Sequence, residues 1–224
     1  MRALKKLFFS HSGPIAADLD DDVRAVLDAW RLLPEVDLGQ SHFSIRYVVV
    51  DVATAGLDSE RDALLGIAGL GLEQGGIITP DDAFALDMAT ADSALSGSQD
   101  RQIAAFLQFL GRGPLVTYQA PFVSDFLGQL LRERLGLEFE PEWIDLAWLL
   151  PDLFKEKIDG LVPMDDWLAA FGIEIPGRRD ALADSVAIAR LLQVALSRAL
   201  IRGADTPGKL MDISRARRWL RPGG

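Results

Sequence analysis

An aspartate at the end of an apolar run is the residue best placed to do chemistry in this 224-residue chain. The run Tyr47-Val-Val-Val50 is rich in β-branched residues and predicts a buried strand that ends at Asp51. Side chains two residues apart on a strand point to the same side, so acids at positions 51 and 53 would converge as a metal site requires. Position 53 is Ala53, which has no atom that could bind a metal. The strand therefore offers a single carboxylate at this point.

Three motifs follow one another in the order and spacing of a known family. The segments Asp51-Val-Ala-Thr-Ala-Gly-Leu57, Tyr118-Gln-Ala-Pro-Phe-Val123 and Arg179-Asp-Ala-Leu-Ala-Asp184 resemble the family patterns Asp-x-Glu-Thr-x-Gly-Leu, His-Asn-Ala-x-Phe-Asp and His-x-Ala-x-x-Asp. Trp143-Ile-Asp145-Leu and Trp167-Leu-Ala-Ala-Phe-Gly also match segments between the motifs. Over about residues 45–200 the chain resembles the epsilon-type (DEDDh) 3′–5′ exonucleases, related to the epsilon subunit of DNA polymerase III, which have a ribonuclease H-like fold.

The resemblance implies a site in which four carboxylates bind two Mg²⁺ or Mn²⁺ ions that activate water, with a histidine as general base. Carried over position by position, Asp51 and Asp184 are retained, whereas Ala53, Val123 and Arg179 replace the other three residues. We therefore expect no intact catalytic set and at most a weak remnant metal site at Asp51 and Asp184. No cofactor is expected, and Mg²⁺ or Mn²⁺ would be needed only for residual activity.

Arg179 allows two interpretations. A guanidinium cannot accept a proton near neutral pH, so Arg179 cannot replace a histidine base. Without metal ions, Asp51 and Asp184 would repel each other, and Arg179 could neutralise them as a structural salt bridge. Alternatively, Arg179 could be the anion contact of a pocket that binds a phosphate or nucleotide.

Four other residues are candidates to substitute for the missing groups. Asp180 precedes Asp184 by four residues and could share its helix face. Asp125 lies two residues beyond position 123, about 200° around a helix, and should face elsewhere. His11 and His42 lie outside the motifs and are expected to be surface or packing residues.

The remaining pattern predicts a ribonuclease H-like α/β fold, a mixed five-stranded sheet flanked by helices. Three successive apolar runs, with a turn at Gly75-Gly76, predict an antiparallel meander, and helices then alternate with short strands. The later helices are expected from Ser98 to Leu110, Ser124 to Leu135, Met164 to Phe171 and Asp180 to Arg202, and the later strands at 115–118 and 143–145.

We expect three parts: a helical N-terminal extension over residues 1–44, an exonuclease-like domain over 45–203 and a basic C-terminal tail over 204–224. The extension is expected to pack on the domain or to dock a partner. The tail could be solvated, could form a last helix packed through Leu210, Ile213 and Trp219, or could contact an acidic partner or nucleic acid.

The composition excludes several classes of function. The chain has 23 Lys and Arg against 33 Asp and Glu, a net charge of −10, which disfavours tight binding of nucleic acid. It has no cysteine and two histidines, so disulfides, thiol catalysis and sites with several imidazoles are excluded. No run is long enough to span a membrane, and we expect a cytoplasmic protein.

The function expected from these observations is that of a pseudo-exonuclease, a regulatory or protein-binding subunit with an exonuclease scaffold. A protein partner is expected, since stand-alone members of the family are sometimes paired with nucleotide-sensing or CBS-domain signalling proteins. Two alternatives stay open: a weak metal-dependent 3′–5′ exonuclease on single-stranded nucleic acid, and a nucleotide-binding module without catalysis.

Overall fold

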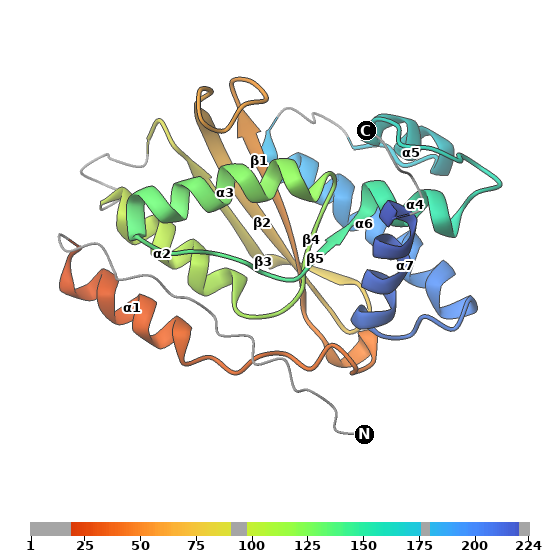
Figure 1. The fold of residues 1–224 in the computed structure, drawn as a ribbon, viewed down its shortest axis with the longest axis horizontal. Coiled ribbons are helices and arrows are strands. Elements are labelled where there is room, and N and C mark those ends of the chain that lie inside the picture. Colours follow the sequence, from red (N-terminus) through yellow and green to blue (C-terminus); the bar gives the residue numbers. More distant parts are fainter. Residues whose placement is uncertain (1–18, 91–97, 176–179, 220–224) are drawn as a thin grey trace.

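The computed structural model describes residues 19–90, 98–175 and 180–219, and a five-stranded sheet runs through its centre in the order β3-β2-β1-β4-β5 (Figure 1). The strands are β1 (Tyr47–Thr54), β2 (Leu64–Glu73), β3 (Ile77–Asp87), β4 (Leu115–Thr117) and β5 (Trp143–Asp145). The first three are antiparallel to one another, and β4 and β5 are parallel to β1. The predicted mixed α/β sheet with its antiparallel meander is therefore confirmed.

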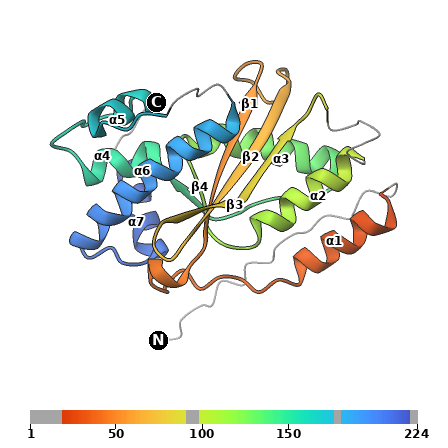
Figure 2. The ribbon, with the colours of Figure 1, turned by 180° about the vertical axis from the view of Figure 1, so that it is seen from behind.

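The helices cover both faces of the sheet (Figures 1 and 2). They are α1 (Asp21–Arg31), the short 3₁₀ helix η1 (His42–Ser44), α2 (Gln99–Leu110), α3 (Ala120–Leu135), α4 (Leu146–Leu153), α5 (Met164–Phe171), α6 (Ala181–Ile201) and α7 (Pro207–Trp219). No helix in the described part of the chain is long and apolar enough to cross a membrane.

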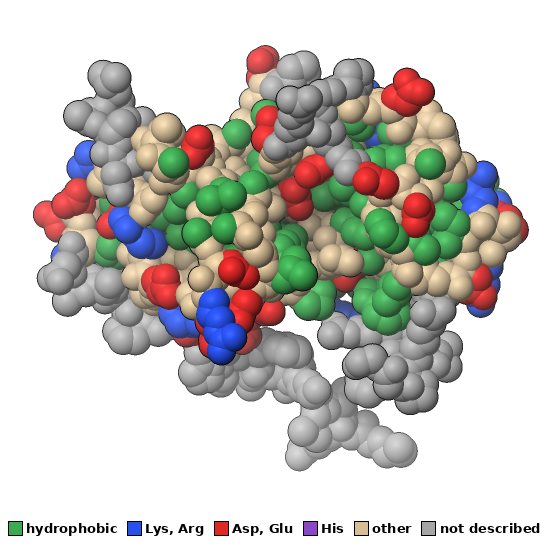
Figure 3. All heavy atoms as spheres, turned by 90° about the horizontal axis from the view of Figure 1, so that it is seen from above, with side chains coloured by type: hydrophobic (Ala, Val, Ile, Leu, Met, Phe, Trp, Pro, Cys, Tyr) green, Lys and Arg blue, Asp and Glu red, His purple; other side chains and the backbone are tan. Residues whose placement is uncertain are grey.

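Strand β1 separates two hydrophobic cores. Tyr47 and Val49 pack with α4, α5, α6 and α7, which we call the α6-side core. Val48 and Val50 pack with α1, α2 and α3, which we call the α3-side core. Because strand side chains alternate, Asp51 faces the α6 side. The carboxyl ends of β1, β4 and β5 meet at one edge of the sheet, where the surface is hollowed (Figure 3).

Helix α1 is part of the α3-side core. Its side chains at helical spacing, Val23, Leu27 and Trp30, are buried there. Trp30 Nε1 donates a hydrogen bond of 2.9 Å to the carbonyl of Gly111, and the Arg112 guanidinium lies 4.6 Å from the Trp30 ring centroid. The described part of the N-terminal segment thus packs against α2 through one face of a helix.

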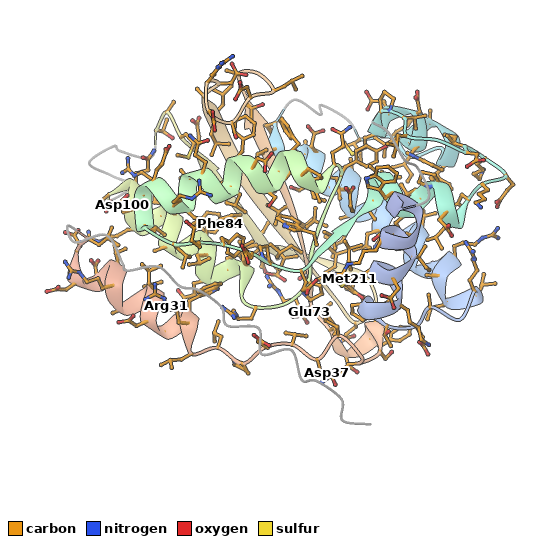
Figure 4. All side chains as sticks on the ribbon, viewed as in Figure 1. Arg31, Asp37, Glu73, Phe84, Asp100 and Met211 are labelled. Atoms are coloured by element: carbon orange, nitrogen blue, oxygen red, sulfur yellow. The ribbon has the colours of Figure 1, made fainter. Side chains whose placement is uncertain are left out.

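The last described helix, α7, packs through its apolar side. Leu210 and Met211 are buried in the α6-side core, and Ile213 packs partly against it. Met211 extends from α7 toward the sheet (Figure 4). Arg215 lies on the exposed side of α7 and pairs with Glu142 at 2.7 Å.

Two predicted boundaries are wrong. Strand β1 continues past Asp51 to Thr54, because Ala53 and Thr54 still pair with β2. Helix α3 begins at Ala120, four residues before the predicted start at Ser124. The earlier start has a tertiary cause: the carboxylate of Asp145, on β5, accepts the backbone N–H groups of Gln119 and Ala120.

Candidate functional site

The two retained aspartates lie on the α6 side of the sheet. Asp51 is half-buried in β1 and pairs with Ala68 of β2. Asp184 is half-buried in the first turn of α6, a helix that packs on β1 and β2. Figure 2 shows that α6 begins beside the carboxyl end of β1. The fold therefore brings the first and last motifs to the same edge of the sheet.

Ala53 and Val123 lie at two of the positions where the resemblance places metal ligands. Ala53 follows Asp51 on the same face of β1, opposite Gly66. Val123 has an exposed fraction of 0% and packs in the α3-side core, with Phe126 and Leu127 in the same cluster. Within residues 19–90, 98–175 and 180–219, no three His, Cys, Asp or Glu side chains are grouped so that they could hold a metal ion.

Within the described part of the chain, the candidate substitutes for the missing groups do not lie beside Asp51 and Asp184 in a way that would complete a metal site. Asp180 is extended and caps α6, since its carboxylate accepts the N–H of Ala183 at 2.8 Å. It therefore precedes the helix and does not share a helix face with Asp184. Asp125 is exposed on α3 whereas Val123 is buried, in agreement with the prediction that Asp125 faces elsewhere. Arg179 and His11 lie outside the described residues.

His42 is a buried packing residue at the opposite end of β1 from Asp51. Its exposed fraction is 0%, its Nδ1 lies 2.5 Å from the Tyr47 hydroxyl and its Nε2 lies 3.0 Å from the carbonyl oxygen of Ala204. A carbonyl can only accept, so Nε2 carries the proton and Nδ1 accepts from Tyr47. Both ring nitrogens are engaged, which leaves none to act as a base.

His42 is expected to make stability depend on pH. Burial lowers the pKa of His42, so the unfolded chain takes up a proton at higher pH than the folded chain does. Stability should therefore fall as the pH drops through about 6.5, by at most about 1.4 kcal/mol per pH unit for one proton. Urea unfolding between pH 7.5 and 5.5 measures this slope, and His42→Phe should flatten it. Parallel pH curves for the two proteins would contradict the prediction.

Asp145 organises the carboxyl ends of β4 and β5. Its carboxylate accepts three backbone N–H groups at 3.0 Å, from Gln119, Ala120 and Ala147. It thereby holds the starts of both α3 and α4, and it holds Gln119 in a left-handed conformation with φ of 66°. In the sequence Asp145 is part of a matching segment without a role of its own. The signal that could have identified it is an aspartate directly before a helix.

Tyr118 follows β4 at the position where the resemblance places the first residue of the second motif. Its hydroxyl donates to the carbonyl of Val162, and burial raises the pKa of Tyr118. This bond ties the end of β4 to the segment before α5. Tyr118 therefore stabilises the position of the segment before α5 relative to β4, at the same edge of the sheet as Asp145.

No family model matches the chain. Two curated proteins are similar in sequence, both DNA polymerase III of the PolC type. The protein from Clostridium perfringens is 25% identical over 175 residues, which cover 71% of this chain and 12% of the polymerase. The protein from Thermotoga petrophila is 24% identical over 147 residues, which cover 59% of this chain and 11% of the polymerase. The chain thus spans about an eighth or less of the relatives that it matches.

Solved structures of nucleases share the fold. E. coli Exonuclease I in complex with a dT13 oligonucleotide superposes with a TM-score of 0.54 at 13% identity, over 73% of this chain and 43% of that one. Cell-death related nuclease 4 superposes with a TM-score of 0.52 at 15% identity, over 74% of this chain and 66% of that one. With the strand order and the helical layers described above, the chain has the ribonuclease H-like α/β fold of DEDD-type exonucleases.

Proposed function

We propose that this protein uses an exonuclease-like fold for binding and does not hydrolyse nucleic acid. The observation that carries the proposal is the burial of Val123 in the α3-side core. The resemblance implies a metal-binding aspartate at that position. An apolar side chain that is part of the core leaves no oxygen there to bind a metal.

The side chains at the edge of the sheet do not fit the pair of metal ions that the resemblance implies. Magnesium requires six oxygen ligands in near-octahedral geometry, and paired ions share several carboxylates. Asp51 and Asp184 supply two carboxylates, and Ala53 supplies none. The general-base position is Arg179, and loss of a general base alone lowers a rate by about 10²–10⁴-fold.

A nuclease assay tests the proposal. The purified chain is incubated with single-stranded DNA and RNA that carry a 5′ label, with Mg²⁺ or Mn²⁺, and the products are separated by length. We expect no shortening from the 3′ end above the level of Asp51→Ala and Asp184→Ala. Cleavage by the wild-type chain that disappears in both variants would establish the weak exonuclease instead.

The fold supports a second candidate, binding of single-stranded nucleic acid or a nucleotide without cleavage. Exonuclease I, whose fold this chain shares, was solved with an oligonucleotide bound. Fluorescence anisotropy with labelled dT oligonucleotides tests strand binding, and a thermal-shift panel of nucleotides tests small ligands, since a ligand that binds only the folded state raises the Tm. The net charge of −10 disfavours this candidate, and flat responses in both measurements would exclude it.

A further inference from the structure

A groove opens beside the carboxyl ends of β4 and β5. Two adjoining hollows of about 270 and 470 Å³ share Gln119, Leu161 and Val162. Phe122 of α3 and Trp148 of α4 line the first hollow, and Met164 of α5 lines the second. The groove therefore continues from the edge that carries the motifs toward α4 and α5.

The walls of the groove are more apolar than polar. Among the described residues that line it, none is Lys, Arg or His. Asp145 also lines the groove, but its carboxylate already accepts three backbone N–H groups. A phosphate would therefore find no cation among these lining residues, whereas an aliphatic or aromatic side chain would find matching surfaces.

The rim of the groove is acidic. Asp165 and Asp166 are exposed in the first turn of α5, directly after Pro163 and Met164 in the groove wall. Burial is the largest cause of the raised pKa of the Tyr118 hydroxyl, followed by the negative charges of Asp145 and then Asp166. Figure 3 shows hydrophobic and acidic side chains around the hollow at this edge. The exposed carboxylate of Asp166, in a chain with a net charge of −10, favours a basic ligand and disfavours a nucleic-acid backbone.

We propose that the groove binds an extended segment of a partner protein in which an aromatic or aliphatic side chain is flanked by Lys or Arg. The apolar side chain would enter between Phe122, Trp148 and Leu161, and the basic residues would face the acidic rim. Gln119 is exposed at the shared part of the groove, where its amide can meet the backbone of an extended segment. This assignment rests on the proposed function, since it names the partner chemistry of a binding protein.

The test is a panel of fluorescein-labelled heptapeptides, measured by anisotropy with the full chain. Each peptide has a central Phe, Trp, Leu or Met, flanked either by Lys and Arg or by Asp and Glu. We expect the basic peptides to bind better than the acidic ones. Leu161→Ser should weaken their binding about tenfold, because a large part of one apolar contact is lost. Leu161 has an exposed fraction of 47%, so the substitution should leave the fold intact, which thermal unfolding checks.

Matched control substitutions distinguish the loss of a contact in the groove from a general effect of substitution on the protein. Ile201→Ser removes an apolar side chain with an exposed fraction of 80% at the end of α6 and should leave peptide binding unchanged. Asp166→Asn should weaken the basic peptides about threefold, whereas Asp212→Asn on α7 should not. No preference for basic flanks, or equal binding by wild type and Leu161→Ser, would overturn the proposal.

Other occupants would give different outcomes. Binding of a labelled dT oligonucleotide that weakens in Leu161→Ser would assign the groove to nucleic acid instead. The chain itself contains Lys5-Lys-Leu-Phe-Phe9, a basic and apolar sequence. Tighter peptide binding after Lys5→Glu and Lys6→Glu would show that this segment of the chain itself occupies the groove. It would overturn the proposal that the groove binds a partner protein. Absence of peptide binding would overturn the groove proposal but not the proposed lack of hydrolysis, which the nuclease assay tests separately. Nuclease activity together with intact peptide binding would overturn only the proposed lack of hydrolysis.

Discussion

Substitution of Val123 by aspartate is expected to lower the free energy of unfolding by about 3–5 kcal/mol, without completing a metal site. Val123 has an exposed fraction of 0% and packs among apolar side chains, so a carboxylate there would be buried without a partner. Urea unfolding followed by circular dichroism measures the loss. Added Mn²⁺ should not restore the lost stability, because position 123 lies in the α3-side core whereas Asp51 and Asp184 lie on the α6 side of the sheet.

The matched control is Val123→Ala, which removes apolar contacts but adds no charge. It should cost about 1–3 kcal/mol, less than the aspartate. A Val123→Asp protein that unfolds like wild type, or that becomes more stable with Mn²⁺, would mean that position 123 still belongs to a metal site. In that case the main support for the proposed loss of hydrolysis would be gone.

Substitution of Asp145 by alanine is expected to cost about 3–4 kcal/mol, because three backbone N–H groups at two helix starts lose their acceptor together. Asp145 is buried, so water cannot fully replace the carboxylate. Asp180→Ala is the control, since Asp180 is exposed and accepts one N–H at the start of α6. The control should cost about 1 kcal/mol.

Asp145→Asn tests which part of the effect is due to charge. The amide keeps one acceptor oxygen, so Asp145→Asn should lower the free energy of unfolding by less than Asp145→Ala does. A loss for Asp145→Ala no greater than that for Asp180→Ala would show that the starts of α3 and α4 are held by other contacts. The proposed groove should also change shape in Asp145→Ala, because Gln119 would be released from its left-handed conformation.

The central fold was predictable because its signals are local. The β-branched run at Tyr47-Val-Val-Val50 and the turn at Gly75-Gly76 gave the meander, and Ser98 marked the start of α2, where it accepts the N–H of Arg101. Alternation along β1 was enough to assign Asp51 and Ala53 to one face. These features depend on neighbours within a few residues.

What could not be predicted depends on partners far away in the sequence. Helix α3 begins early because of Asp145, 25 residues beyond Ala120. His42 was expected to be a surface or packing residue, but its partner Ala204 lies 162 residues away and cannot be inferred from the pattern. The burial of Val123 follows from the packing of α3 on β1, whereas the sequence shows only that the residue is apolar.

The packing of α1 has a consequence for the order of events during synthesis. Trp30 bonds to Gly111, which lies 81 residues later, and Asp20 pairs with Arg101 of α2. At about 5–20 residues per second, a ribosome needs about 4–16 seconds to add those 81 residues. Over that interval the apolar face of α1 has no complete core to enter. Helix α1, the first helix in the described part of the chain, therefore cannot dock until α2 and Gly111 have been made, and a chaperone that covers Trp30 should increase the yield of folded protein.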